Sequence, residues 1–273
     1  MSKTVHKNKT ESSDEMSFWS HLEELRWHLI RSIIAILLFS IAAFFSREFI
    51  FDSIILAPKT PQFITNILLC KLAEITNVTT LCINNTNLEI VNLDMSGQFI
   101  THIYISFAAG IIVAIPYIIA EIWTFIRPAL YNNEKKNISG VIFITSTLFI
   151  VGVLFSYFII VPLTINFFST YQVSTTINNT ISLRSYIDTV VSLSFAVGLV
   201  FELPIFVFFL TKMGLLTPDF MKKNRRLMIV IILIISAIIT PADIFSQIIV
   251  AIPLYILYEF SIGIAKFEYN RKA

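Results

Sequence analysis

The sequence has few of the residues from which soluble domains and enzyme sites are built. Only 14% of its 273 residues are charged and 56% are hydrophobic, and its mean hydropathy is +0.77, far from soluble proteins. Its 7 glycines leave little room for a nucleotide cradle, and its 4 histidines lack metal-ligand spacing with one another or with the 2 cysteines. No nucleophile elbow is present. We therefore expect a membrane protein that is not an enzyme, without catalytic residues, cofactor or metal.

Long apolar segments are what the sequence has instead. Six can be drawn: residues 29–46, 99–122, 138–168, 186–210, 227–239 and 244–263. Each of the first four approaches the roughly 20 residues that a helix needs to cross a bilayer. Pro116, Pro162, Pro204 and Pro253 would bend four of the spans. We predict an all-α integral membrane protein whose six transmembrane helices form a curved, cupped bundle.

Basic residues divide unevenly between the two sides of such a bundle. With alternate loops on alternate sides, 16 of the 20 Lys and Arg share one side, and only Arg47, Lys59, Lys71 and Arg184 lie opposite. The positive-inside bias makes the basic side cytoplasmic, with both termini on it. No early apolar region precedes a cleavage site, so the first span should remain as an anchor. We expect a disordered cytoplasmic tail at 1–16, one membrane domain at 17–265 and a cytoplasmic tail at 266–273.

The outer loop, residues 47–98, is the largest segment outside the spans. Apolar residues recur at helical spacing within it and predict a short amphipathic helix that covers the outer mouth. They are Phe63, Ile67, Leu68, Leu72 and Ile75. The run 76–87 should be irregular. Cys70 and Cys82 also lie here, on the oxidising side, so we predict a disulfide, with two free structural thiols as the alternative.

The last two spans are short in sequence. Residues 227–239 would extend about 20 Å against a hydrocarbon thickness near 30 Å. The next segment runs only about 23 Å from Ile244 before Glu259 interrupts it. We expect this hairpin, joined by a tight turn at 240–243, to thin the bilayer or to be shielded by other helices. Snorkelling of its charged ends and a re-entrant hairpin, which would place the C-terminus outside, remain open.

Glu202 is the only ionisable residue between Asp188 and Lys212, and Pro204 follows it. A charge at the centre of a spanning helix costs about 2.5–3.5 kcal/mol, so this acid should be neutral, paired or in a wet cavity. The proline frees backbone carbonyls nearby. We interpret Glu202 as a functional polar site on the concave side, with a buried structural acid as the alternative.

The segment before the first span reads as a charged amphipathic helix. Ser20 and Glu23 form a capping-box pattern that predicts a helix start. Glu23 can pair with Arg26 three residues on, whereas Glu24 has only a tryptophan and a histidine at such spacings. The carboxylate of Glu24 is thus predicted to be available to an external cation. An interfacial anchor with a solvated polar face is the alternative.

Five motifs, in order from residue 17 to about 265, give the chain a family resemblance. They are Ser17-Phe18 with His21-Leu22-x-Glu24-Leu25-Arg26, Leu56-Ala57-Pro58, Phe125-Ile126-Arg127-Pro128-Ala129-Leu130-Tyr131 with Glu134, Phe201-Glu202-Leu203-Pro204, and Thr240-Pro241-Ala242-Asp243-Ile244-Phe245-Ser246-Gln247. On these motifs the chain resembles TatC, the polytopic core subunit of the twin-arginine (Sec-independent) protein translocase. His28 stands where the family usually has a basic residue, so no role is carried onto it.

The resemblance implies a receptor that binds paired-Arg signal peptides of folded precursors and nucleates export driven by the proton-motive force. Its partners would be single-span TatA- and TatB-type subunits, further copies of itself and membrane lipid, in the bacterial cytoplasmic (inner) membrane, with an organellar origin left open. The basic run at 222–226 adjoins a span, which favours lipid over nucleic acid. A proton-coupled small-solute transporter centred on Glu202 is the alternative function.

Residue roles follow from the same resemblance. Two guanidinium groups call for carboxylates as planar, bidentate acceptors. Glu24, Glu134 and Arg26 would bind the signal peptide, and Glu202 with Pro204 would form a polar site for a partner within the membrane. The remaining motif positions would be structural; they are Pro58, Pro128, Asp243 and Gln247.

Overall fold

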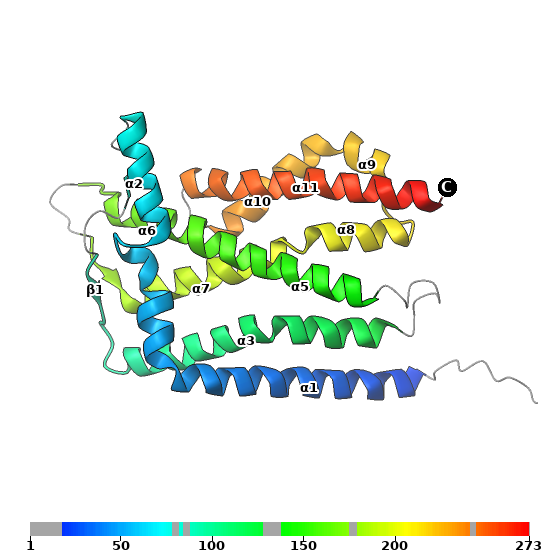
Figure 1. Ribbon diagram of the computed structural model, residues 1–273, viewed down its shortest axis with the longest axis horizontal. Coiled ribbons are helices and arrows are strands. Elements are labelled where there is room, and N and C mark those ends of the chain that lie inside the picture. Colours follow the sequence, from blue (N-terminus) through cyan, green and yellow to red (C-terminus); the bar gives the residue numbers. More distant parts are fainter. Residues whose placement is uncertain are drawn as a thin grey trace, which may run out of the picture.

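The computed structural model describes residues 18–77, 82–83, 88–127, 138–174, 179–240 and 244–272. Long helices lie side by side along one direction, with a group of short elements at one end (Figure 1). The helices of this bundle are α1 (Phe18–Phe45), α3 (Gly97–Ile126), α5 (Ile138–Phe155), α6 (Val161–Thr170), α7 (Leu183–Val200), α8 (Leu203–Lys212), α10 (Arg225–Ile239) and α11 (Ile244–Lys272), of which α6, α8 and α10 are the short ones. The prediction of an all-α membrane protein is confirmed.

Five helical segments are long and apolar enough to cross a membrane: His21–Phe45, Gly97–Ile126, Ser139–Thr170, Leu183–Lys212 and Gln247–Tyr269. Two of them are composite. A π-helical stretch, η5 (Ser156–Ile160), joins α5 to α6, and a turn at Phe201 and Glu202 separates α7 from α8. Pro162 and Pro204 lie in the first turns of α6 and α8, where a missing N–H costs little. Pro116 and Pro253 lie inside α3 and α11, which continue through them, so the bends expected at the four prolines stay a prediction.

The core gathers around α7. Ile187, Leu193 and Val197 of this helix are at most 1% exposed, and Leu254 of α11 packs into the same cluster. Much of the apolar surface of α1, in contrast, is exposed: Leu29, Leu38 and Ile41 are 55–62% exposed, although α1 lies beside α3 along its length (Figure 1). The exposed apolar side of α1 is what lipid would cover.

The hairpin formed by α10 and α11 differs from the prediction in the length of its second helix. α10 has 15 residues and is short, but α11 has 29 and continues past Glu259. The helix therefore does not end where Glu259 interrupts the apolar segment, and the shortness of the membrane span within it stays a prediction. Arg225 Nη2, at the start of α10, donates to Glu259 Oε2 at 2.8 Å, and the Tyr255 hydroxyl donates to Oε1 at 3.0 Å. Because this acid has partners, it does not end the helix. Residues 241–243 of the turn lie outside the described part of the chain.

Short elements build the outer segment. A π-helical turn η1 (Phe49–Ile55), a 3-10 turn η2 (Ala57–Lys59), α2 (Ile64–Thr76) and β1 (Ile90–Val91) follow one another, and α9 (Pro218–Lys223) lies at the opposite end. β1 pairs in parallel with β2 (Ile181–Ser182), with Ile90 opposite Ile181. This pairing joins two loops that the sequence treats as separate.

The helix predicted in the outer loop exists as α2, but it does not cover the mouth. Figure 1 shows α2 projecting across the direction of the long helices. Phe63 at its start is buried, whereas the predicted apolar residues that follow are 41–78% exposed. They are Ile67, Leu68, Leu72 and Ile75. That part of the prediction is wrong, because the first turn alone packs against the bundle.

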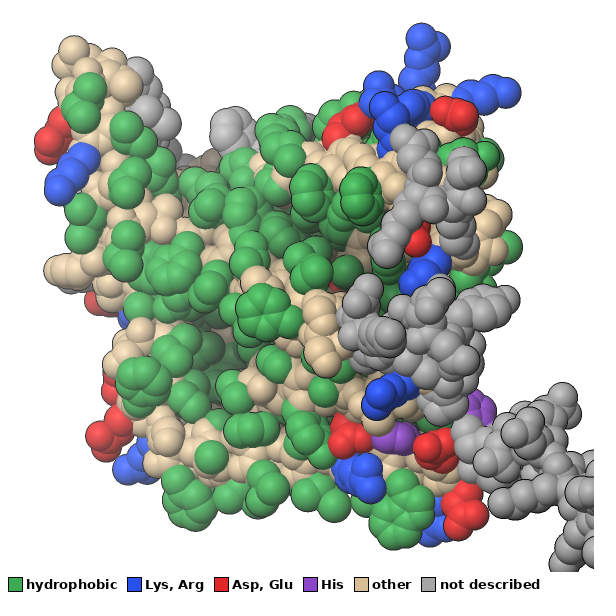
Figure 2. Space-filling view, turned by 45° about the vertical axis from the view of Figure 1, so that its right-hand side comes forward, with side chains coloured by type: hydrophobic (Ala, Val, Ile, Leu, Met, Phe, Trp, Pro, Cys, Tyr) green, Lys and Arg blue, Asp and Glu red, His purple; other side chains and the backbone are tan. Residues whose placement is uncertain are grey.

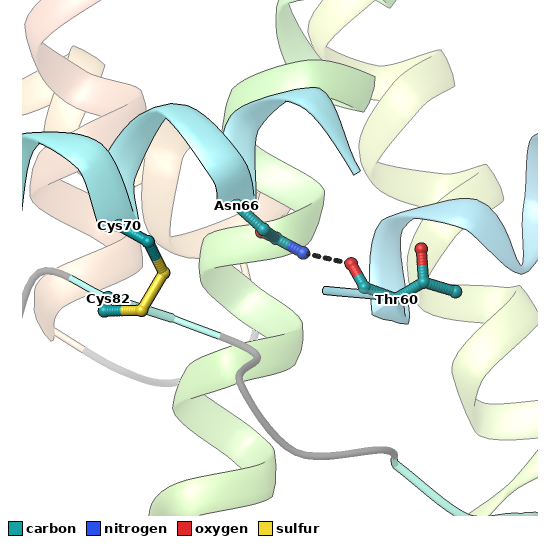
Figure 3. Close-up of a disulfide and its surroundings, with 4 residues drawn as sticks. All are labelled: Thr60, Asn66, Cys70 and Cys82. Atoms are coloured by element: carbon teal, nitrogen blue, oxygen red, sulfur yellow. Dashed lines mark hydrogen bonds between the residues drawn. A yellow bond between two sulfur atoms is a disulfide. The ribbon is translucent and has the colours of Figure 1, made fainter. Parts of the chain in front are cut away.

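Cys70 and Cys82 are joined in a disulfide, which closes the C-terminal half of α2 onto the following chain (Figure 3). Near it, the Asn66 side-chain amide donates to the carbonyl oxygens of Thr60, at 2.7 Å, and Pro58, at 3.2 Å. Residues 78–81 and 84–87 of the predicted irregular run lie outside the described residues.

Candidate functional site

The N-terminal part of α1 carries the predicted acid. The helix is already formed at Phe18, so Ser20 lies inside it and the predicted start at a capping box is wrong. Glu23 and Arg26 are both exposed, and no ion pair joins them in the described structure. The predicted internal pair is thus absent, because two exposed side chains gain little from pairing in water.

Glu24 is half-buried, and its Oε2 atom is buried without a hydrogen-bond partner among the described residues. A carboxylate oxygen in this position is costly until a donor reaches it. This matches the sequence-based argument that Glu24 lacks a partner along its own helix. Glu134 and Pro128 lie outside the described residues, so the structure does not place them relative to Glu24.

A cluster that the sequence analysis missed holds α1 against α3. The His28 ring is 8% exposed, and its Nδ1 forms a hydrogen bond with Glu121 Oε2. Arg31 Nη1 lies 3.9 Å from the same oxygen. Two turns nearer the N-terminus, the His21 ring stacks on Phe125 with centroids 4.3 Å apart. The cluster fixes how α1 lies on α3, beside Glu24.

In Figure 2 this end of α1, at the lower right, combines histidine, acidic and basic side chains next to an otherwise apolar surface. A signal for the cluster was present in the sequence. Glu121 is an acid one residue from the end of the apolar segment 99–122, as unexpected there as Glu202 in its own span. Its partner His28 is 93 residues away, which spacing along a helix cannot reveal.

Glu202 is 7% exposed and lies in the turn between α7 and α8. Its carboxylate lies close to the backbone of Phe149 in α5, yet neither oxygen has a hydrogen bond of acceptable geometry in the described part of the chain. Close helix packing surrounds it. A Cβ on Gly152 would lie 2.7 Å from Phe201 Cβ, and one on Gly198 would lie 2.8 Å from Val153 Cγ2.

An apolar hollow of about 570 Å³ lies elsewhere in the bundle, among α1, η1, α3, α5, η5 and α7. Phe39, Ala108, Tyr157 and Val190 are among its lining residues, and Glu202 is not. The hollow gives the bundle a recessed apolar face. Glu202 instead is nearly buried among the neighbouring helices.

Two predicted structural residues have defined contacts. Pro58 is fully buried in η2, and its carbonyl accepts the bond from Asn66. The Gln247 side-chain amide donates to the Leu233 carbonyl at 2.9 Å and so ties α11 to α10. Pro204 is buried at the start of α8. Asp243 lies outside the described residues.

Comparison with known proteins gives a consistent set of relatives. Residues 20–253 match the family model described as Sec-independent protein translocase protein (TatC). The TatC protein of Blattabacterium sp. subsp. Periplaneta americana is 41% identical over 95% of this chain and 98% of its own length. That of Aquifex aeolicus is 35% identical over 94% of this chain and 98% of its own length.

Solved structures agree with these relatives. A crystal structure titled as the twin arginine translocase receptor TatC is 34% identical, covers 91% of this chain and 99% of its own, and superposes with a TM-score of 0.67. A second, of TatC in DDM, is 35% identical, covers 89% and 98%, and has a TM-score of 0.69.

Proposed function

Because the chain belongs to the TatC family of Sec-independent protein translocases, we propose that it is the receptor and core subunit of a twin-arginine translocase. As a family member it is a multi-pass membrane protein of transport rather than a classical enzyme, with bacterial relatives. We place it in the bacterial inner membrane with both termini in the cytoplasm. The observation that carries the proposal is the buried oxygen of Glu24 at the N-terminal end of α1, which has no hydrogen-bond partner among the described residues.

Recognition of a paired-Arg signal peptide would begin at this carboxylate. A guanidinium group offers donors in a planar fork that suits a carboxylate. Glu134 would receive the second arginine, and Arg26 would contribute at the same surface. Exposed ion pairs yield only about 0.2–1 kcal/mol each, so the apolar part of the peptide must supply most of the affinity. The recessed apolar face described above supports such a contact.

Partner subunits would use the interior acid. Both oxygens of Glu202 lack a hydrogen bond within the described residues, so a donor on a partner span would satisfy them. Pro204 supports the site by breaking the helix beside it. The assembled complex would contain several copies of this chain and export folded precursors using the proton-motive force.

A peptide-binding measurement tests the proposal. Purified protein in lipid nanodiscs is titrated with a fluorescent signal peptide that carries Arg-Arg or, as a specificity control, Lys-Lys. We expect Glu24→Ala to weaken Arg-Arg peptide binding by up to about fivefold, because one such ion pair contributes about 0.2–1 kcal/mol. Glu23→Ala, one residue away and exposed, is the matched control and should bind as the unmodified protein does.

Two results would contradict the proposal. One is a larger loss of binding in Glu23→Ala than in Glu24→Ala. The other is recovery of the purified protein with a tightly bound small solute and without single-span partners or precursors, which would favour a transporter centred on Glu202.

A further inference from the structure

α2 has an apolar side that the rest of the described chain does not cover. Along this helix Ile64 is 64% exposed, Leu68 55% and Ile75 78%, and they recur at a spacing that places them on one side. Ile67 and Leu72 flank them. A row of exposed apolar side chains that extends over two or more helical turns indicates a surface that contacts lipid or another protein.

The attachment of α2 is rigid on its other side. The buried Phe63 ring stacks on Phe158 with centroids 5.5 Å apart, and the Thr65 hydroxyl donates to the Phe158 carbonyl. Ala73 is 6% exposed, and the Cys70–Cys82 disulfide holds the second half of the helix. Because these contacts fix its direction, α2 presents the uncovered row in one fixed orientation.

That orientation is set by the long helices. Figure 1 shows α2 running across them, at the end of the bundle where α1 ends and α11 begins. The spanning helices lie along the membrane normal, so α2 runs along the membrane plane at the level of their ends. By the charge-based topology this end is the outer one. α2 extends beyond the bundle rather than over it.

The polarity of α2 is consistent with this position. In Figure 2 the projecting helix at the upper left has its charged side chains on the outer edge, while hydrophobic side chains face the rest of the molecule across a gap. Lys71 and Glu74 are the only charged residues of α2. Glu74 lies about 120° from Leu68 around the helix. Lys71 lies within about 60° of Ile64, Leu68 and Ile75, on the same side of the helix. Its long side chain can bring its ammonium group from this side to the headgroups.

We propose that α2 is an interfacial helix whose row Ile64, Leu68 and Ile75 inserts into the outer leaflet of the bilayer beside the bundle. A short helix at the bilayer boundary binds by burying its apolar side chains among acyl chains, while a lysine on that side extends its charged end to the headgroups. The occupant is lipid, because the row extends from the bundle at the level where the spans leave the hydrocarbon. This role requires neither signal peptide nor partner subunit.

Depth-dependent quenching tests the proposal. Leu68→Trp is compared with Glu74→Trp, each in a background in which Trp19, Trp27 and Trp123 are changed to Phe. The proteins are reconstituted in phosphatidylethanolamine–phosphatidylglycerol vesicles containing a phosphatidylcholine brominated near the headgroup end of its chains. We expect the tryptophan fluorescence of Leu68→Trp to be quenched by the brominated lipid about threefold more than that of Glu74→Trp, and its emission maximum to lie at a shorter wavelength. Equal quenching at the two positions would overturn the proposal.

A second measurement does not depend on removing tryptophans. A photoreactive benzoylphenylalanine replaces Leu68 in the otherwise unmodified protein, which is irradiated in native membranes. A mass increase equal to one phospholipid is the expected result. Crosslinking mainly to a second copy of the chain, to a single-span protein or to no partner would show that this side of α2 does not lie in lipid.

Discussion

The carboxyl group of Glu202 lies in a helix break with neither oxygen bonded among the described residues. If its role is hydrogen bonding to a partner span, the amide in Glu202→Gln should preserve much of the transport activity. Glu202→Ala should lose partner association while the protein still inserts, because the polar group is gone. Recovery of single-span subunits with the purified protein, together with export of a reporter precursor, measures both. Full export by the Ala variant would reduce Glu202 to a tolerated structural acid.

The pair of His28 and Glu121 allows a second residue-scale prediction. Glu121→Ala leaves the nearly buried His28 ring without its acceptor, and should lower the free energy of unfolding by about 1–3 kcal/mol. Signal-peptide binding should weaken as well, because α1 is no longer fixed to α3 beside Glu24. Thermal unfolding and the peptide titration measure the two effects. Glu121→Gln keeps a hydrogen-bonding group and should restore most of both; failure to do so would mean that the charge is required.

The prediction that Glu24 has no partner along its own helix depended only on neighbouring residues of that helix. The sequence alone was therefore sufficient to make it. His28 lies 93 residues from Glu121, and Arg225 lies 34 residues from Glu259. No periodicity links such positions, and only Tyr255, four residues before Glu259, lay at helical spacing from its partner. Sequence reasoning therefore noted Glu259 without its contact to Arg225, missed the pair of Glu121 and His28, and ended the last apolar segment at residue 263, short of the end of α11 at Lys272.

Among the elements, the apolar helices were predictable because each is defined by its own composition. α2 was predictable as a helix, but its environment was not, since amphipathic spacing does not say whether lipid or protein covers the apolar side. The parallel pairing of β1 with β2 was also missed. Its four residues carry no pattern of their own and depend on contacts between distant loops.

The disulfide of α2 gives a prediction at the element scale. Mass spectrometry of unreduced protein should find neither Cys70 nor Cys82 alkylated. Replacing both by serine should lower stability by about 2–4 kcal/mol, because the bridge no longer restricts the unfolded chain, and should expose α2 to proteolysis before the bundle. Thermal unfolding with and without reductant measures this. Two free thiols in protein purified without reductant would contradict the bridge.

For the whole molecule, the uneven distribution of basic residues predicts that both termini are cytoplasmic. A fluorescent protein fused after Ala273 should therefore fold and fluoresce, and alkaline phosphatase inserted after Asn77 should be active outside the cytoplasm. A re-entrant arrangement of α10 and α11 would reverse the result for the C-terminal fusion alone. The order of the spans could be derived from composition, whereas the packing of α7 at the centre required the structure.

The pairing of Ile90 with Ile181 also sets an order for biosynthesis. A ribosome adding 5–20 residues per second needs about 5–20 s to make the chain between these two residues. Throughout that interval α2 and its two cysteines have already been translated, while the strand that completes this face does not exist. Thiol oxidation takes seconds or longer, so the disulfide has time to form before β2 is synthesised. β2 then pairs with β1 in a segment that the disulfide already crosslinks.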